Sequence, residues 1–434
     1  MLVQSKIRNL NLQMVSGEEN YIQRVLDQKL TLDEFKELEN VAEYVGVTPE
    51  FKKVIDTFHV PEGETPAGFE VQLEVNADRV LRANLKRNIS YDKNGQKRPT
   101  NLLFSADSAN PYEVAPVAGM LANLTCNPGI IYDLFINNPK ANVGGKFKTR
   151  DEVMAEIGRI LGPGCDISVE LNDPFGKSDA EILEEAEHFK ELLSEYRVVI
   201  KVPHTGPVNK DNVKQLLTGD KKLDRRYNDV STVDAFRGHN LALMLHEHGF
   251  RVNFTLMFEA PQTALALQAR PYFINSFIRH RMMQSQEMKK ILELYNVTRD
   301  SKYLTDLRTF MVAKDYFAAG EEDVDLLAVK AKAETILAQR HINDPEGSDG
   351  LDGIRHNLRL LRQTNMDDTR LIICSMEGDH NYYDIDRLLA SDEYGDMAGR
   401  VVLTAEPNYL AQFSSANQVV SYQRRFMNAA NGAQ

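Results

Sequence analysis

The chain has 434 residues, of which 42% are hydrophobic and 26% are charged, a composition typical of a globular protein with ample core-forming material. Its formal net charge of −12 argues against nucleic acid as a general partner, because phosphate backbones bind basic surfaces. The sequence has no apolar run of the roughly 18 residues that a membrane span needs and no signal-peptide core at its start, so we expect a cytoplasmic protein without a membrane partner.

The first part of the chain, residues 1–98, is polar and mostly helical in pattern. A threonine cap and an acidic first turn open residues 31–60, and apolar residues recur there at intervals of three and four. Residues 69–75, FEVQLEV, alternate like a strand, and residues 90–100 have the composition of a linker. We therefore predict a mainly helical N-terminal extension.

After this extension, short β-rich runs alternate with helical stretches. Eight strands in such alternation over about 300 residues predict an α/β fold, a (β/α)8 TIM barrel, over residues 99–412. A doubly wound parallel sheet is the alternative. The predicted strands are residues 101–107, 121–126, 165–171, 197–203, 250–258, 271–277, 369–375 and 400–405.

Two connections are too long for plain strand-to-helix units. We interpret residues of about 209–240 and 282–368 as insertions on the barrel, the second with several helical segments. Residues 413–434 have the pattern of a final helix with a frayed tail. The added helices could cap the active site or form an interface between identical subunits, and the sequence leaves both possibilities open.

Polar side chains gather at the predicted carboxyl ends of the strands, which is where barrel enzymes place their catalytic residues. Asn253 and Thr255 alternate along one strand and therefore face the same side of it. On the barrel interpretation, the following residues converge in one apolar shell: Asp107, Thr125, Asn127, Glu170, Lys201, Thr205, Asn253 and Thr255.

Lys201 is unusual because it lies inside an apolar, β-branched strand, RVVIKVP. We expect desolvation to lower its pKa, so that the free amine could attack a carbonyl and form a Schiff base. A protonated imine withdraws electrons, so that a neighbouring C–C bond can break. Carboxylates would then carry the protons, and asparagine amides could hold substrate hydroxyls.

Each of these residues also has a structural explanation. A lysine in an apolar run can reach solvent through its alkyl chain or pair with a neighbouring carboxylate. Glu170 or Asp107 could be an ion-pair partner or a helix cap, and Asn253 and Thr255 could be satisfied core polar groups. The order and spacing of the whole set favour the catalytic interpretation.

The motifs that carry these residues resemble transaldolases and the related fructose-6-phosphate aldolases. The resemblance is strong over about residues 101–281 and weaker over 369–412. The matching segments are, in order, LFSADSANPYEV, LTCNPGIIYD, ISVEL, VVIKVPHT and VNFTLMFEAPQTALALQARPYFINSF.

This resemblance implies a (β/α)8 barrel with Lys201 as the Schiff-base lysine and Asp107 as the acid/base of C–C cleavage. Glu170 and Thr255 would work through a catalytic water. No metal or organic cofactor is expected, and Cys126, Cys165 and Cys374 form no metal or redox pattern. The implied substrate ligands are Asn127, Asn253 and Thr125, with Phe277 packed beside the imine.

The sequence departs from the family around the expected phosphate site. The family's serine before the strand 6 phenylalanine is here Asn275 or Ser276, and its phosphate-binding arginine falls on Arg279, His280 or Arg281, depending on the alignment. A glutamate, Glu377, stands where the family has its second phosphate-binding arginine, and a carboxylate repels phosphate.

Two other polar runs could belong to a remodelled site. Residues 221–226, KKLDRR, could supply a replacement phosphate site or be a solvated charge run. His380, Tyr382 and Tyr383 could line the altered pocket or have no functional role.

These observations favour a transaldolase-like enzyme of carbohydrate metabolism, in the pentose phosphate pathway if it resembles the family closely. Its partner would be a small carbonyl substrate, a sugar or a sugar-like molecule, with altered phosphate recognition. The sequence does not separate a transferase from a lyase. The alternative is a catalytically inactive barrel that binds a ligand or a protein through its added helices.

Overall fold

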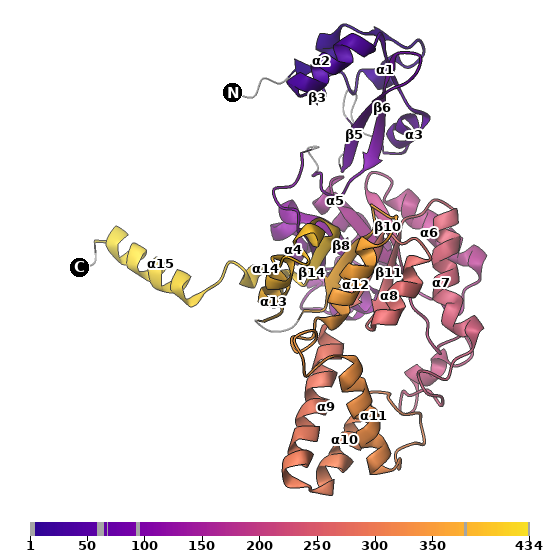
Figure 1. Ribbon diagram of the computed structural model, residues 1–434, viewed down its shortest axis with the longest axis vertical. Helices are drawn as coiled ribbons and strands as arrows, with labels where there is room; N and C mark the ends of the chain where they lie inside the picture. The colour runs from indigo at the N-terminus through magenta and orange to yellow at the C-terminus, as the bar shows by residue number, and fades with distance from the viewer. Residues whose placement is uncertain (1–4, 59–64, 67, 93–95, 377–379, 433–434) are drawn as a thin grey trace.

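The structure is a computed structural model that describes residues 5–58, 65–66, 68–92, 96–376 and 380–432 (Figure 1). Its centre is a closed barrel in which every strand is parallel to its neighbours. The strands follow one another in chain order, and the last, β14, pairs with the first, β7. They are β7 (Leu103–Asp107), β8 (Leu121–Thr125), β9 (Asp166–Glu170), β10 (Arg197–Pro203), β11 (Val252–Met257), β12 (Phe273–Phe277), β13 (Arg370–Cys374) and β14 (Val401–Ala405).

The barrel confirms the predicted fold class, and each of its eight strands coincides with a predicted run. The alternative of an open, doubly wound sheet was wrong, because Val402 of β14 pairs with Leu103 of β7 and leaves no edge. The strands were recognisable because they are nearly continuous apolar runs, as expected for strands covered on both faces. Leu124, Ile167 and Val202, for example, are fully buried.

Helices surround the barrel between successive strands (Figure 1). The helices that follow β7, β8, β9, β10, β11, β13 and β14 are, in chain order, α4 (Pro111–Val114), η2 (Ala115–Met120), η3 (Gly129–Ile136), η4 (Val143–Gly145), α5 (Arg150–Leu161), α6 (Asp179–Leu192), η5 (Val213–Leu217), α7 (Thr232–Glu247), α8 (Ala260–Leu267), α13 (His380–Leu389), η6 (Gly395–Arg400) and α14 (Pro407–Gln412). Helix α7 packs on β10 and β11, so the added segment between these strands ends before residue 232, earlier than the predicted 240.

The connection from β12 to β13 carries a separate helical bundle. Its helices α9 (Arg279–Thr298), α10 (Ser301–Ala313) and α11 (Leu326–Gln339) bury Met288, Leu307 and Val329 in a core of their own. A fourth helix, α12 (Asp352–Arg362), packs on α8 and β13 and so completes the barrel rather than the bundle. Because the bundle follows a strand's carboxyl end, it rises from the face of the barrel that bears catalytic residues in such folds.

The N-terminal region is a small α/β unit at the opposite end of the barrel from the bundle (Figure 1). Its four-stranded sheet has the order β2-β4-β6-β5, and Phe51, Val45 and Leu81 form its buried core. The predicted strand at residues 69–75 is β5, but the prediction of a mainly helical region missed the rest of the sheet, in which β2 and β4 have only two and four residues. Its elements are β1 (Ser5–Lys6), η1 (Ile7–Leu10), β2 (Gln13–Met14), α1 (Glu19–Ile22), β3 (Lys29–Leu30), α2 (Leu32–Val41), β4 (Tyr44–Val47), α3 (Pro49–Thr57), β5 (Phe69–Val75) and β6 (Val80–Arg87).

The chain ends in helix α15 (Asn417–Ala430), which projects away from the barrel with all its residues exposed (Figure 1). A final helix was predicted there. Within the described residues, none of the helices combines the length and apolar character needed to cross a membrane.

A buried ion-pair cluster joins the N-terminal region to the amino-terminal ends of the barrel strands. The carboxylate of Asp166 in β9 accepts from Arg87 Nη2 of β6 at 2.7 Å and from Arg197 Nε of β10 at 2.6 Å. Burial by itself raises the pKa of Asp166, but the two guanidinium charges outweigh burial and hold this pKa below its usual value. Asp166 is therefore a buried carboxylate whose negative charge compensates the two buried guanidinium groups.

We expect Asp166→Asn to lower the free energy of unfolding by about 3–5 kcal/mol, because removal of one partner leaves buried charges uncompensated. Urea unfolding at neutral pH would measure the loss. The matched control is Asp27→Asn, which removes an exposed carboxylate that also contacts two cations, Lys6 and Arg8. Equal losses in the two variants would contradict the account.

Candidate active site

The candidate site is centred on Lys201, which lies in β10 and is only 3% exposed. Its ammonium nitrogen, Nζ, lies 2.9 Å from Glu170 Oε2 and 3.5 Å from the carbonyl oxygen of Cys126. Strand register produces this arrangement, since Lys201 is paired with Glu170 of β9 on one side and with Asn253 of β11 on the other. The lysine therefore belongs to the barrel interior rather than to its outer surface.

Other predicted residues face the same interior. Asp107 and Thr125 are paired at the ends of β7 and β8. Asn253 Nδ2 donates to Ser168 Oγ at 3.1 Å, and Asn275 Nδ2 donates to Thr255 Oγ1 at 3.4 Å. The structure thus brings most of the predicted catalytic and substrate-binding side chains together at one end of the barrel.

Several of these side chains have buried polar atoms that lack a hydrogen-bond partner among the described residues. Buried polar atoms are nearly always satisfied in native proteins, so an exception needs an explanation. A polar ligand in the barrel mouth would satisfy them together. The atoms are Asp107 Oδ1, Thr125 Oγ1, Asn253 Oδ1, Asn275 Oδ1 and Thr404 Oγ1.

The pKa of Lys201 corrects one expectation from the sequence. Burial by itself lowers this pKa, as expected, but the charges of Glu170 and Asp107 outweigh burial and raise the pKa above its usual value. Lys201 is therefore an ammonium in this structure. To act as a nucleophile, its Nζ would have to give up a proton, and Glu170 is the nearest carboxylate.

Burial raises the pKa of Asp107 to about 6. This pKa is the net result of burial, the largest cause, of the charges of Lys201 and Arg279, which lower it, and of the charges of Glu406 and Glu170, which raise it. A carboxyl group with a pKa near neutrality can both accept and return a proton at physiological pH. This property fits a general acid/base, which is the role that the family resemblance implies for Asp107.

Glu406 is a charged neighbour of Asp107 that the sequence interpretation missed. It directly follows β14, and its charge raises the pKa of Asp107. The rule that selected the other residues, a polar side chain at the carboxyl end of a strand, also applies to Glu406 and would have found it. The buried Thr404 of β14 was missed in the same way.

The orientation of β12 shows which of Asn275 and Ser276, the two candidates for the family's serine position, faces the barrel interior. Ser276 Oγ accepts from Asn357 Nδ2 of α12 at 3.1 Å, so Ser276 faces outward. Asn275 and Phe277 alternate with it and face the interior, where Phe277 packs against the buried apolar cluster. Ser276 is therefore not placed to contact a ligand in the barrel mouth.

Asn127, which follows β8, has a local structural role as well. Its Oδ1 accepts from the backbone N–H of Ile130 at 2.9 Å, within the turn that leads into η3. Thr205 Oγ1 donates to the carbonyl oxygen of Asp234, so this threonine braces α7 rather than lining the barrel mouth.

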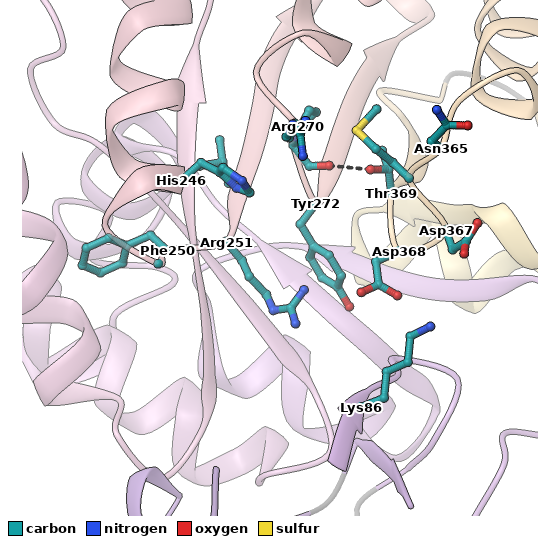
Figure 2. Close-up of a pocket in the computed structure, with 14 residues that line it drawn as sticks. Lys86, His246, Phe250, Arg251, Arg270, Tyr272, Asn365, Asp367, Asp368 and Thr369 are labelled. Atoms are coloured by element: carbon teal, nitrogen blue, oxygen red, sulfur yellow. Dashed lines mark hydrogen bonds between the residues drawn. The ribbon is translucent and has the colours of Figure 1, made fainter. Parts of the chain in front are cut away.

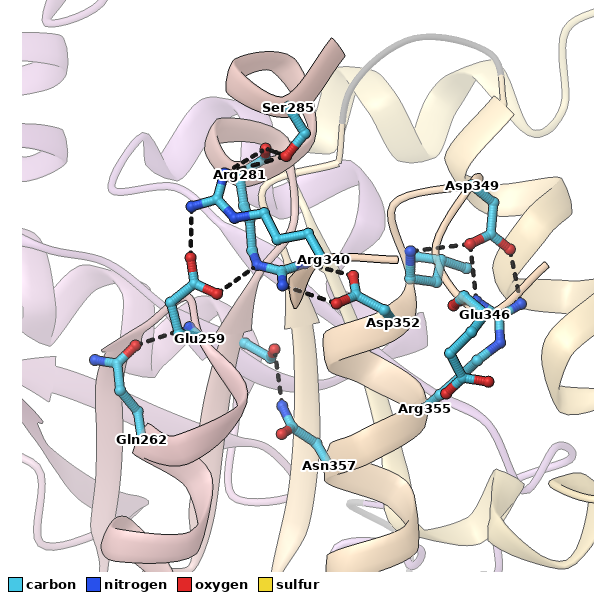
Figure 3. A network of polar contacts seen from close by, with 12 residues as sticks. Glu259, Gln262, Arg281, Ser285, Arg340, Glu346, Asp349, Asp352, Arg355 and Asn357 are labelled. Atoms are coloured by element: carbon cyan, nitrogen blue, oxygen red, sulfur yellow. Dashed lines mark hydrogen bonds and ion pairs between the residues drawn. The ribbon is translucent and has the colours of Figure 1, made fainter. Parts of the chain in front are cut away.

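The predicted arginines differ in their surroundings. Arg279, at the start of α9, acts on Asp107 electrostatically and therefore belongs to the surroundings of the site. Arg281 does not, because all three nitrogens of its guanidinium donate to carboxylates (Figure 3). Its Nε lies 2.9 Å from Glu259 Oε2, and Asp352 accepts from the other two nitrogens. The hypothesis that Arg281 binds substrate phosphate was wrong for this arrangement.

The polar runs outside the family pattern are partly committed to structure. Lys222 donates to the carbonyl of Val312, and Arg226 pairs with Glu321, so the largely exposed run at residues 221–226 is anchored to the bundle at two points. Tyr382 packs against Phe413, and Tyr383 is exposed. Glu377 lies outside the described residues, as does the side chain of His380.

A separate pocket of about 500 Å³ lies at the amino-terminal ends of β11, β12 and β13 (Figure 2). Figure 2 shows Arg251 and Tyr272 on its wall, with Lys86 of the N-terminal region at one edge. None of the predicted site residues lines it. Among the described residues, no group of three or more histidine, cysteine or acidic side chains is arranged to hold a metal ion.

The structure thus combines a (β/α)8 barrel with a buried lysine and two carboxyl groups at the carboxyl ends of its strands. Residues 104–301 match the family model described as transaldolase/fructose-6-phosphate aldolase, which confirms the resemblance seen in the motifs. The match runs from β7 to the start of α10 and includes Asp107, Glu170 and Lys201. A comparison with curated proteins finds no match.

We expect Asp107→Asn to stabilise the protein at pH values above about 6. The pKa of Asp107 is about 6 in the folded protein against an ordinary 3.8, so its stabilising contribution is complete below pH 3.8 and is lost as the pH rises through 6. The gain of the variant over the wild type should approach at most about 3 kcal/mol at high pH and disappear toward pH 4.

Thermal unfolding from pH 4 to pH 8 measures this difference. The control is Asp27→Asn, because hydrogen bonding by Lys6 lowers the pKa of Asp27 and its removal should bring no gain at high pH. A pH-independent difference for Asp107→Asn would show that this carboxyl group titrates normally.

Proposed function

We propose that the protein is a transaldolase-like enzyme that cleaves or forms C–C bonds of a ketose or a related carbonyl substrate through an imine on Lys201. The observation that carries the proposal is the burial of the Lys201 ammonium beside Glu170 and Asp107, in a barrel mouth that also holds unsatisfied polar atoms. A substrate with a carbonyl and several hydroxyls could react with Lys201 and also form hydrogen bonds with the unsatisfied polar atoms.

The reaction would begin with transfer of a proton from Lys201 Nζ to Glu170 Oε2, 2.9 Å away. The free amine attacks the substrate carbonyl and forms a carbinolamine. Glu170, through a water held with Thr255, returns the proton to the carbinolamine hydroxyl, which leaves as water. The product of this step is a protonated imine, in which the positive charge of the lysine is retained.

Cleavage would then depend on Asp107. Its carboxylate takes the proton from the hydroxyl on the carbon that becomes the carbonyl carbon of the leaving aldehyde. That C–C bond breaks, its electron pair moves toward the imine nitrogen to form an enamine, and an aldehyde leaves. With a pKa of about 6, Asp107 can return the proton when the enamine attacks an acceptor aldehyde or is itself protonated. The first outcome is a transfer and the second an aldol cleavage.

Substrate hydroxyls would be held by the unsatisfied oxygens of the barrel mouth, those of Thr125, Asn253 and Asn275, together with Asn127. Arg279 is the remaining candidate for an anionic group, and Phe277 would pack beside the imine. A cytoplasmic role in carbohydrate metabolism remains part of this proposal.

The alternative is an inactive barrel in which Lys201 and Glu170 form a purely structural ion pair. The raised pKa of Lys201 is the observation that favours this alternative, since a permanently charged ammonium cannot attack a carbonyl. The two functions differ in whether Lys201 Nζ can lose its proton and form an imine with a carbonyl compound. Chemical trapping with borohydride detects this imine.

Incubation with dihydroxyacetone, fructose or fructose 6-phosphate, followed by borohydride reduction, should add the mass of one donor less one oxygen atom to the wild-type protein, because imine formation releases water and reduction adds two hydrogens. Peptide mapping should place the adduct on Lys201. Lys201→Met should form no adduct. Since this variant leaves Glu170 without its partner, its folding is checked by thermal unfolding, and the mapping of the wild-type adduct does not depend on it. An adduct at another lysine alone would reject this role for Lys201.

Asp107→Asn and Glu170→Gln should separate the two halves of the reaction. Loss of the Asp107 carboxylate should lower the rate of C–C cleavage by about 10²–10⁴-fold, with imine trapping retained. Glu170→Gln should instead slow imine formation itself. Trapping rates and aldehyde release, measured on both variants, check this difference, and identical defects in both would contradict the assigned roles.

A further inference from the structure

A cavity of about 780 Å³ lies where the inserted segments meet the carboxyl face of the barrel. Its wall includes Phe258, which follows β11, and His280 in the first turn of α9. The inserted segments supply Tyr227, which precedes α7, Tyr316, which follows α10, and Ile336 of α11. The cavity therefore exists only because the two additions to the barrel fold back over this face.

This cavity adjoins the candidate active site through aromatic rings. The ring of Phe258, on the cavity wall, lies 5.0 Å from the ring of Phe277, centroid to centroid. Phe277 ends β12 and packs against the apolar cluster inside the barrel. The contact between Phe258 and Phe277 thus links the cavity wall to the barrel interior that holds Lys201, and a ligand that occupies both would pass these two rings.

The buried charges of the cavity wall are paired with one another (Figure 3). Arg281 Nη2 lies 2.7 Å from Asp352 Oδ2 and its Nε lies 2.9 Å from Glu259 Oε2. Arg340 donates to the other oxygen of Glu259 at 2.5 Å. Because Arg281 and Arg340 already have carboxylate partners, these two guanidinium groups do not need a phosphate to neutralise them. The same contacts join α9, α11 and α12, and so hold the cavity open.

The surface that remains for a ligand is mostly apolar and includes the rings of Tyr227, Phe258 and Tyr316, with the exposed Lys314 and Asp315 also among the lining residues. The rings of Tyr227 and Tyr316 lie 6.3 Å apart, and the hydroxyl of Tyr316 is already bonded to Gln284. Aromatic faces favour other rings and apolar groups. The volume is within the range of small-molecule sites and far exceeds what a three-carbon ketone would fill.

We propose that this cavity binds the far end of the carbonyl substrate, and that this end is an uncharged, ring-bearing group instead of a phosphate. The inference rests on the proposed imine chemistry at Lys201. The inference assigns a chemical class to the end of the substrate farthest from the carbonyl, which the family resemblance left open. It also gives the inserted bundle a role in substrate specificity.

The test compares three donors in borohydride trapping: dihydroxyacetone, fructose 6-phosphate and the aryl hydroxyketone 1-hydroxy-4-phenylbutan-2-one. The wild-type protein should reach half-maximal trapping at a concentration of the aryl ketone about tenfold lower than that of dihydroxyacetone, because the phenyl ring gains the aromatic contacts. Fructose 6-phosphate should show no such advantage.

Two variants locate the effect. Ala260→Phe fills the cavity and should weaken trapping of the aryl ketone about tenfold while dihydroxyacetone is trapped as in the wild type. Tyr227→Ala removes a ring that is 49% exposed, so it should not threaten folding, and it should weaken trapping of the aryl ketone severalfold. Tyr44→Ala, which removes a tyrosine exposed in the N-terminal region, should change nothing.

The outcomes separate the inference from the proposed function. An adduct with dihydroxyacetone but no preference for the aryl ketone would overturn the inference and leave the imine chemistry intact. Preferred trapping of fructose 6-phosphate that Ala260→Phe abolishes would show that the cavity takes a phosphate. No adduct with any donor would overturn both. Thermal unfolding of Ala260→Phe guards against a folding defect, and Tyr227→Ala carries the test if that variant is unstable.

Discussion

The ion pair between Lys201 and Glu170 is the interaction on which the candidate site depends. An ammonium buried in an apolar barrel is costly unless an anion compensates it, and strand register places Glu170 Oε2 2.9 Å away. Glu170 and Asp107 together raise the pKa of Lys201 and so keep it charged in this structure. Asp107 is the second carboxyl group in the barrel interior, and its own pKa is raised to about 6. A lysine with two nearby carboxyl groups that can carry protons is what imine chemistry requires.

The additions to the barrel alter what can approach this centre. The bundle of α9, α10 and α11 begins at the carboxyl end of β12 and folds over the barrel mouth, and Arg281 and Arg340 are used to hold it there. An arginine in the neighbourhood of an expected phosphate site is thus occupied with structural carboxylates.

The sequence was sufficient for the barrel and for its centre, for reasons that particular residues illustrate. The strands were apolar on both faces, and a charged residue inside one of them, Lys201, had few explanations. Asn253 and Thr255 could be placed on one face by their alternation alone. The same alternation would have favoured Asn275 over Ser276, and the strand-end rule would have found Glu406.

Other features could not be read from the sequence because they depend on contacts between distant segments. Arg281 pairs with Asp352, 71 residues away, and no local pattern predicts such a partner. The pKa of Lys201 rises because two carboxyl groups lie on other strands, so burial alone gave the wrong direction. In the small sheet of the N-terminal region, alternation revealed β5, but β2 and β4 are too short to show it.

The most direct test of this account is a crystal structure of the protein after incubation with dihydroxyacetone and reduction with borohydride. The account predicts a covalent bond from Lys201 Nζ to the central carbon of the donor, with the donor hydroxyls bonded to the oxygens of Asp107 and Asn253 that now lack partners. An unmodified Lys201 that still pairs with Glu170, in crystals soaked to saturation, would contradict it.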